Sequence, residues 1–226
     1  MSDIRGFIFD LDGVLVDTAR FHYLAWRRLA REEFGFDLTP ELNEQFKGVN
    51  RTACMKVLCR WTGAVLTEAQ FTEMTDRKNG WYVESVEKMT PGDVLPGALE
   101  FVKACRAEGL RLAIGSASKN CALVLSRTGL GSHFDAVADG TVVTRAKPDP
   151  EVFLTAAGML NLAPRECAVF EDAQAGIDAA KAGGMKAVGI ARPGALTGAD
   201  ALYPGLDAVD LRALIAKLGK PERNAT

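Results

Sequence analysis

Residues 6–15 read Gly-Phe-Ile-Phe-Asp-Leu-Asp-Gly-Val-Leu, a short apolar run that passes directly into two aspartates. An uninterrupted apolar run, rather than an alternating one, is typical of a parallel strand that is buried on both faces. Here the run covers Gly6 to Phe9, and Asp10 and Asp12 follow it two residues apart. We expect both carboxylates to face a crevice together, because ligands of open α/β sheets bind outside the carboxyl ends of the strands.

Three further apolar runs predict buried parallel strands, at 110–115, 168–170 and 187–190. Helical stretches with turn signals fill the gaps between them, at 97–109, 120–130, 151–160 and 173–183. Strands that alternate with helices predict an α/β fold with a doubly wound, Rossmann-like parallel sheet.

One gap in this pattern is too long for a single crossover. Residues 17–89 contain no clear strand and predict four helices, at 21–33, from Thr39-Pro40, at 51–62 and from Thr67 toward Met89. We expect an inserted all-helical cap domain with its hinge linkers at 17–91, and a catalytic core formed by 1–16 and 92–226. A domain held by two linkers can close over a site like a lid.

The composition narrows the class of protein. The 226 residues include 48% hydrophobic and 25% charged side chains, and 27 basic against 29 acidic groups leave a net charge of −2. These are globular values that argue against nucleic-acid or membrane-surface binding. Five cysteines without a C-x-x-C pair and only two histidines argue against a zinc site. No targeting segment is recognisable, so we expect a cytoplasmic protein, and a monomer because a closing cap needs free surface.

Polar side chains follow the predicted strands where the site is expected. Ser116 to Asn120 follow the strand at 110–115, Glu171 and Asp172 follow the strand at 168–170, and Lys147 precedes a proline between them. Taken singly, these residues could be turn formers, helix caps, dipole partners or a solvated lysine. If every one of these residues had only such a structural role, their meeting at the carboxyl ends of three strands would be a coincidence.

The combined set has a coherent chemistry, phosphoryl transfer. Asp10 would attack phosphorus to form an aspartyl-phosphate, and Asp12 would handle the proton of the leaving or attacking hydroxyl. Ser116 and Lys147 would take up charge on the phosphoryl oxygens. Mg²⁺ prefers oxygen ligands and often reaches phosphate through carboxylates. The expected ligands are Asp10, Asp12, Glu171 and Asp172.

The order of these motifs along the chain resembles that of a known superfamily. Asp10-Leu11-Asp12-Gly13-Val14, Ser116, Lys147-Pro148 and Glu171-Asp172, in that order, resemble the four motifs of the haloacid-dehalogenase superfamily of phosphoryl-transfer enzymes. The helical insertion resembles the cap domain of that superfamily.

A narrower resemblance is to the beta-phosphoglucomutase family. It is carried by residues 43–51 (Asn-Glu-Gln-Phe-Lys-Gly-Val-Asn-Arg), by His22 with Ala25-Trp26, by Arg77-Lys78-Asn79 with Tyr82, and by 116–120 and 171–177. Asn50 departs from the pattern, where Ser is expected. The resemblance implies interconversion of beta-glucose 1-phosphate and glucose 6-phosphate through glucose 1,6-bisphosphate, with Mg²⁺ and a cap that closes before chemistry. The expected substrate-binding residues are His22, Trp26, Lys47, Gly48, Val49, Arg51, Lys78, Asn79, Ala117, Ser118, Lys119 and Asn120.

Alternatives remain open from the residues alone. Lys47 and Arg51 could form a solvated helix start, and His22 and Trp26 could be a solvent-facing histidine and a core tryptophan. A sugar-phosphate or phosphoglycolate phosphatase with the same core is the second reading. The third is a non-catalytic sugar-phosphate-binding protein, against which the intact set of Asp10, Asp12, Lys147 and Asp172 argues.

Overall fold

The computed structural model describes residues 4–46 and 49–219, and the described part has a core built on one parallel sheet. Its six strands lie in the order β3-β2-β1-β4-β5-β6, and each pairs in parallel with its neighbours. Their bounds are β1 (Gly6–Phe9), β2 (Arg111–Gly115), β3 (Ala136–Ala138), β4 (Cys167–Glu171), β5 (Lys186–Ile190) and β6 (Ala201–Tyr203). The predicted doubly wound fold is confirmed. In this strand order the chain reverses direction across the sheet between β1 and β4, which is where ligands of such folds bind.

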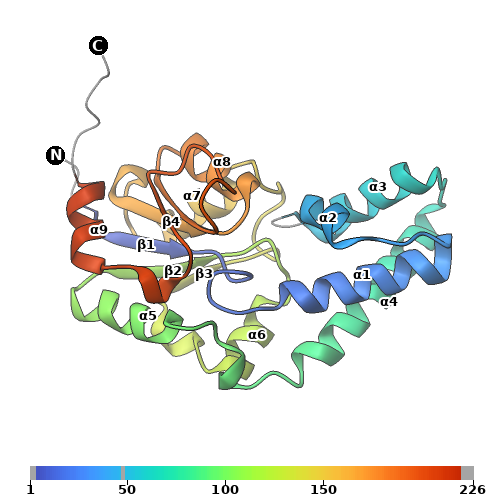
Figure 1. Ribbon diagram of the computed structural model, residues 1–226, viewed down its shortest axis with the longest axis horizontal. Helices are drawn as coiled ribbons and strands as arrows, with labels where there is room; N and C mark the ends of the chain where they lie inside the picture. The colour runs from blue at the N-terminus through green and yellow to red at the C-terminus, as the bar shows by residue number, and fades with distance from the viewer. Residues whose placement is uncertain (1–3, 47–48, 220–226) are drawn as a thin grey trace, which may run out of the picture.

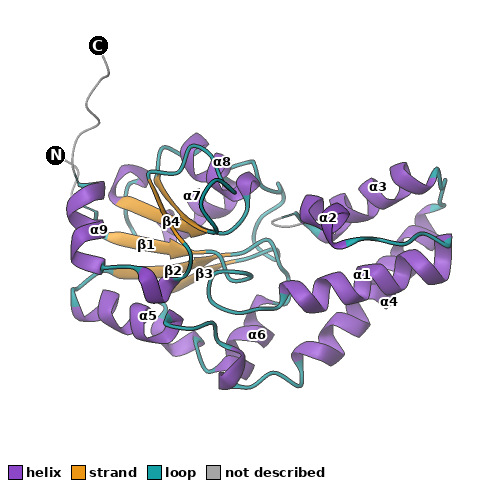
Figure 2. Ribbon diagram, in the orientation of Figure 1, coloured by secondary structure: helices purple, strands orange, loops and turns teal. Residues whose placement is uncertain are grey.

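Helices cover both faces of the sheet (Figures 1 and 2). Alternate residues of β1 separate two cores, because Phe7 and Phe9 belong to one hydrophobic cluster and Ile8 to the other. The first cluster contains residues of α5 (Ala98–Ala107), α6 (Cys121–Thr128) and α9 (Leu211–Leu218). The second contains residues of α7 (Glu151–Met159) and α8 (Gln174–Ala182). The rings of Phe9 and Phe170 stack with centroids 4.6 Å apart, which fixes β1 against β4.

The insertion is helical, as predicted, and lies to one side of the sheet (Figure 1). It contains α1 (Ala19–Phe34), α2 (Pro40–Asn43), α3 (Arg51–Thr62) and α4 (Glu68–Val86). The side chain of Asn50 accepts a hydrogen bond from the N–H of Ala53, and Thr67 forms a capping box with Gln70. Trp26, Leu29 and Met55 are buried in a third cluster that is separate from the two sheet cores. The boundaries at 16/17 and 91/92 stay a prediction.

Some elements of the fold, α9 among them, were not predicted from the sequence. Strands β3 and β6, three residues each, were not predicted, and they form the two edges of the sheet. A run of three residues carries too little periodicity to be recognised.

Across residues 4–46 and 49–219, no helix combines the length and apolar character needed to cross a bilayer.

Candidate active site

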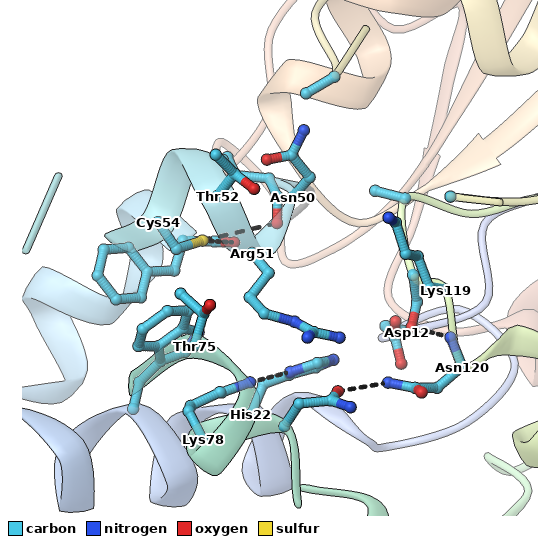
Figure 3. A pocket seen from close by; sticks show the side chains of 18 of the residues that line it. Asp12, His22, Asn50, Arg51, Thr52, Cys54, Thr75, Lys78, Lys119 and Asn120 are labelled. Carbon is cyan, nitrogen blue, oxygen red and sulfur yellow. Dashed lines mark hydrogen bonds between the residues drawn. The ribbon is translucent and has the colours of Figure 1, made fainter. Parts of the chain in front are cut away.

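Several of the polar residues at the strand ends and the inner side of the cap face the same cavity of about 550 Å³. Asp10, Asp12 and Asp172 line it from the core, and helices α1, α3 and α4 line it from the cap. In Figure 3 the side chain of Arg51 extends from α3 toward Asp12. A cavity between two parts of a chain is a common location for a small-molecule site.

Lys147 is the centre of the polar cluster in the core. Its Nζ atom lies 2.6 Å from Oδ1 of Asp10 and 2.8 Å from Oε2 of Glu171, and it also donates to the carbonyl oxygen of Gly115 at 3.2 Å. All three charged side chains are buried. Burial alone would lower the pKa of Lys147, but the carboxylates of Asp10 and Glu171 outweigh it and the pKa is raised. The lysine therefore stays cationic between the two acids.

The two aspartates of the first motif have shifted pKa values. Burial raises the pKa of Asp10 to about 7, against the opposing effect of Lys147. Burial, followed by the charge of Asp10, raises the pKa of Asp12 to about 8. Oδ1 of Asp12 is buried without a hydrogen-bond partner among the described residues. A carboxyl group whose pKa lies near neutrality can both give and accept a proton, as a general acid/base must.

The predicted metal ligands are partly brought together. Asp10, Glu171 and Asp172 each offer an oxygen, and these oxygens lie within 4.8 Å of one another. Two glycines make room for this group: a Cβ on Gly13 would lie 2.2 Å from Oδ2 of Asp172, and one on Gly176 would lie 2.0 Å from Oε2 of Glu171. A set of carboxylate oxygens in a tight cradle fits Mg²⁺. Asp12 is not a member of this group, and its place among the ligands stays a prediction.

In the loop after β2, serine hydroxyl groups accept hydrogen bonds from backbone N–H groups of the same loop. Ser116 is buried, and its Oγ accepts a hydrogen bond from the N–H of Ser118 at 3.1 Å. Oγ of Ser118 in turn accepts from the N–H of Asn120 at 3.1 Å. Ala117, Ser118, Lys119 and Asn120 all line the cavity, whereas Ser116 lies at the end of β2 beside Gly115.

The cap contributes a paired histidine and lysine. Nζ of Lys78 lies 2.8 Å from Nδ1 of His22 and 4.9 Å from the centre of the Trp26 ring. Burial, followed by the charge of Lys78, holds the pKa of His22 well below its usual range, and burial lowers the pKa of Lys78 to about 7. The imidazole is therefore neutral and shares a hydrogen bond with the Lys78 side chain, whose direction depends on the tautomer of the imidazole. Lys78 and Trp26 are buried, and all three residues line the cavity.

The remaining predicted cap residues are placed as follows. Arg51 lines the cavity and pairs with Asp76 at 3.5 Å, and Val49 lines it as well. Oδ1 of Asn79 accepts a hydrogen bond from Nδ2 of Asn120 at 2.9 Å, which joins cap and core across the cavity (Figure 3). Lys47 and Gly48 lie outside the described residues.

The sequence interpretation missed some residues of the cavity wall. Thr75 and Asp76 belong to the face of α4 that carries Lys78 and Asn79, and the helical spacing of three to four residues could have indicated them. Thr144 and Arg145 come from the loop between β3 and α7. That loop could not be placed because β3 was not predicted.

This chain belongs to the haloacid dehalogenase-like hydrolase family, whose sequence profile matches residues 4–184. It is 39% identical over 199 residues to the beta-phosphoglucomutase of Bacillus subtilis (strain 168), a match that covers 87% of this chain and 88% of that protein. It is 33% identical to the phosphorylated carbohydrates phosphatase of Thermotoga maritima, over 80% of this chain and 82% of that protein.

A solved structure agrees with the sequence matches. The crystal structure of beta-phosphoglucomutase from Clostridium difficile superposes with a TM-score of 0.91 at 34% identity, and covers 95% of this chain and 97% of that one. The resemblance to the beta-phosphoglucomutase branch of the superfamily is confirmed, and the matches support an enzyme of the isomerase class.

Proposed function

We propose that this chain is a phosphomutase that interconverts beta-D-glucose 1-phosphate and D-glucose 6-phosphate through an aspartyl-phosphate on Asp10 and a glucose 1,6-bisphosphate intermediate. The observation that carries the proposal is the two-sided cavity. Asp10 lines the cavity from the core and is paired with the buried Lys147, and Arg51 and Lys119 offer cationic groups on the same cavity. A substrate with one phosphate at each end could bind both regions, since guanidinium and ammonium groups suit phosphate.

The residues account for both half-reactions. The C6 hydroxyl of beta-glucose 1-phosphate attacks the phosphoryl group on Asp10, the P–O bond to Asp10 breaks, and Asp12 takes the hydroxyl proton. After the bisphosphate turns around, Asp10 attacks the phosphorus at C1, and Asp12 returns the proton to the departing C1 oxygen. Glucose 6-phosphate leaves, and the phosphorylated enzyme is restored. The raised pKa of Asp12 supports this double role.

The phosphoryl group carries negative charge while it is transferred, and positively charged groups of the site must stabilise this charge. Lys147 and the Ser116 hydroxyl would bind phosphoryl oxygens, and Asp10, Glu171 and Asp172 would hold Mg²⁺. When bound, the cation would reduce the repulsion between the phosphoryl group and the attacking carboxylate. Glucose 1,6-bisphosphate would prime the enzyme.

The cap would hold the sugar and exclude water. We assign this task to the cap domain at 17–91, which would close over the core formed by 1–16 and 92–226 with the chain acting as a monomer. The bond between Asn79 and Asn120 supports a direct approach of the two parts. Lys47 and Gly48 remain proposed substrate-binding residues on the resemblance alone.

A phosphatase acting on sugar phosphates is the second candidate. The similarity to the Thermotoga maritima phosphatase favours it, because the same core could pass the phosphoryl group from Asp10 to water. In that case the cap would leave water access to the phosphorylated aspartate.

The two candidates differ in their products. The protein is given beta-glucose 1-phosphate, Mg²⁺ and a trace of glucose 1,6-bisphosphate, with glucose 6-phosphate followed by coupled NADP⁺ reduction and free phosphate assayed in parallel. We expect glucose 6-phosphate with little free phosphate, and no product from the alpha anomer. Release of phosphate without isomerisation would replace the mutase by the hydrolase. Asp10→Asn should form no product in either assay.

A further inference from the structure

Asp76 lines the cavity, but neither half-reaction assigns it a task. Among residues 4–46 and 49–219, it is the only carboxylate that the cap contributes to the cavity wall. It lies in α4, and its Oδ1 atom is 3.5 Å from Nη1 of Arg51, the first residue of α3. Arg51 is one of the two cations that the proposed function offers to the second phosphate of the substrate. The carboxylate and that phosphate are therefore two anions that can pair with the same cation.

The surroundings of Arg51 favour an anion beside it. The first turn of α3 contains no acidic residue, and the N-terminal end of a helix carries a partial positive charge. The charge of Arg51 contributes to the lowered pKa values of His22 and Lys78, so the arginine lies close to other basic groups. Burial lowers the pKa of Arg51, and the charge of Asp76 opposes this effect. Within the described part of the chain, Asp76 is the anion that balances Arg51.

The two partners of this ion pair differ in exposure. The side chain of Arg51 is 28% exposed, whereas that of Asp76 is 69% exposed. When the pair opens, the carboxylate stays hydrated, and the partly buried guanidinium needs another anion. The distance of 3.5 Å is also longer than that of a normal hydrogen bond, about 2.7–3.2 Å. A phosphate group, which carries more charge and offers several oxygens to the guanidinium, is therefore the stronger partner for Arg51.

We infer that Asp76 is a positioning residue that acts through Arg51: its carboxylate pairs with the guanidinium until the second phosphate of the substrate displaces it. The inference rests on the proposed function, in which Arg51 binds that phosphate. Because binding has to break the pair of Arg51 and Asp76, Asp76 weakens the binding of the sugar bisphosphate. Weaker binding suits an intermediate that must turn around between the two half-reactions.

The test measures the binding of glucose 1,6-bisphosphate by calorimetry in the presence of Mg²⁺. Asp10→Asn is the background, because it removes the nucleophile and leaves the bisphosphate intact. We expect the additional substitution Asp76→Asn to lower Kd about threefold, the effect of losing one exposed ion pair. Asp76→Glu keeps the charge and should leave Kd near the value of the background. When Arg51→Gln is also present, Asp76→Asn should have no effect, because the cation of the pair is gone.

Asp37→Asn is the matched control. Asp37 is also an exposed cap aspartate and pairs with Arg27 and Arg31, but it does not line the cavity. Its substitution changes the net charge by the same amount, so a general attraction of the anion would appear in both variants. We expect its Kd to equal that of the background. An unchanged or raised Kd in Asp76→Asn, or an equal decrease in Asp37→Asn, would overturn the inference.

The kinetic readout is a difference between KM and kcat. With Asp10 intact, Asp76→Asn should lower KM for beta-glucose 1-phosphate about threefold, and kcat should not rise. Binding that is equally strong in the ground state and the transition state changes KM alone. A raised KM would mean that Asp76 helps Arg51 to bind phosphate, and would also overturn the inference.

The calorimetric measurement separates this inference from the proposed function, because it does not depend on turnover. If the wild-type protein releases phosphate and forms no glucose 6-phosphate, the mutase assignment fails. Tighter binding of the bisphosphate by the Asp76→Asn variant would still sustain the competition at Arg51. If glucose 6-phosphate is formed and Kd does not change, the mutase stands and the inference about Asp76 fails.

Discussion

Nζ of Lys147 lies 2.6 Å from Oδ1 of Asp10, although the two residues are 137 positions apart in the chain. The same ammonium group contacts Glu171, so one buried cation serves two buried acids. Removing one partner of a buried pair leaves an uncompensated charge, which is far more costly than the pair is stabilising. This relationship makes Lys147 the residue on which both the stability and the charge balance of the site depend.

Lys147→Met should therefore destabilise the protein. We expect the free energy of unfolding without Mg²⁺ to fall by about 3–5 kcal/mol, measured by urea denaturation. Lys181→Met, which removes a partly exposed lysine from its pair with Asp200, should cost less than about 1 kcal/mol. Equal effects of the two substitutions would contradict the central role of Lys147.

Gly176 makes room for the carboxylate cradle, so alanine at this position is predicted to lower the stability of the protein, in contrast to its usual effect inside a helix. Gly176→Ala lies inside α8, where alanine ordinarily stabilises a helix by up to about 1 kcal/mol. Here its Cβ would lie 2.0 Å from Oε2 of Glu171, so the carboxylate must move away from Lys147. We expect a loss of stability and weaker Mg²⁺ binding by calorimetry. Gly158→Ala in α7 has open space around the new Cβ and should be neutral or stabilising. A stabilised Gly176→Ala protein with unchanged Mg²⁺ binding would count against the cradle.

The His22–Lys78 pair predicts a selective loss of mutase activity. His22→Asn removes the partner of Lys78 and should lower glucose 6-phosphate formation about a hundredfold, because small errors in positioning cost this much. Hydrolysis of a small phosphate ester, which does not need the cap, should fall much less. His133→Asn lies away from the cavity and should change neither rate. An equal loss of both activities in His22→Asn would remove its assigned role.

Burial of Lys78 predicts a pH-dependent stability. Its pKa is lowered to about 7, so the folded state loses this proton near neutrality while the unfolded chain keeps it up to about pH 10.5. Between these values the unfolded state binds more protons, and this group therefore makes stability rise with pH. Lys78→Met should be more stable than the wild type at pH 6.5, and the difference should shrink at pH 9.5. Urea denaturation at both values measures this, and a difference independent of pH would contradict the shifted pKa.

The sequence predicted the centre of the sheet better than its edges. The strand at Gly6–Phe9 and its partners are continuous apolar runs buried on both faces, and this pattern is visible without any knowledge of pairing. The edge strands at Ala136–Ala138 and Ala201–Tyr203 are too short to carry a pattern. The caps at Asn50 and Thr67 were predictable because capping acts within four residues.

The site was predictable as far as topology determines it. Carboxyl ends of neighbouring parallel strands meet at one edge, so Asp10 and Glu171 were expected together. The simultaneous contact of Lys147 with both acids depends on a long connection and was not predictable from local pattern. The same holds for the stack of Tyr82 on His22, which joins two helices far apart in sequence.

The fate of the phosphorylated enzyme tests the central claim most directly. The protein is labelled on Asp10 with radioactive acetyl phosphate in the presence of Mg²⁺, which transfers its phosphoryl group to Asp10 and leaves as acetate, and unlabelled beta-glucose 1-phosphate is then added by rapid mixing. We predict that the label passes to the sugar bisphosphate and then to glucose 6-phosphate, with little free phosphate during the first turnovers. Label that appears as free phosphate at the same rate with and without the sugar would contradict the mutase and identify a hydrolase.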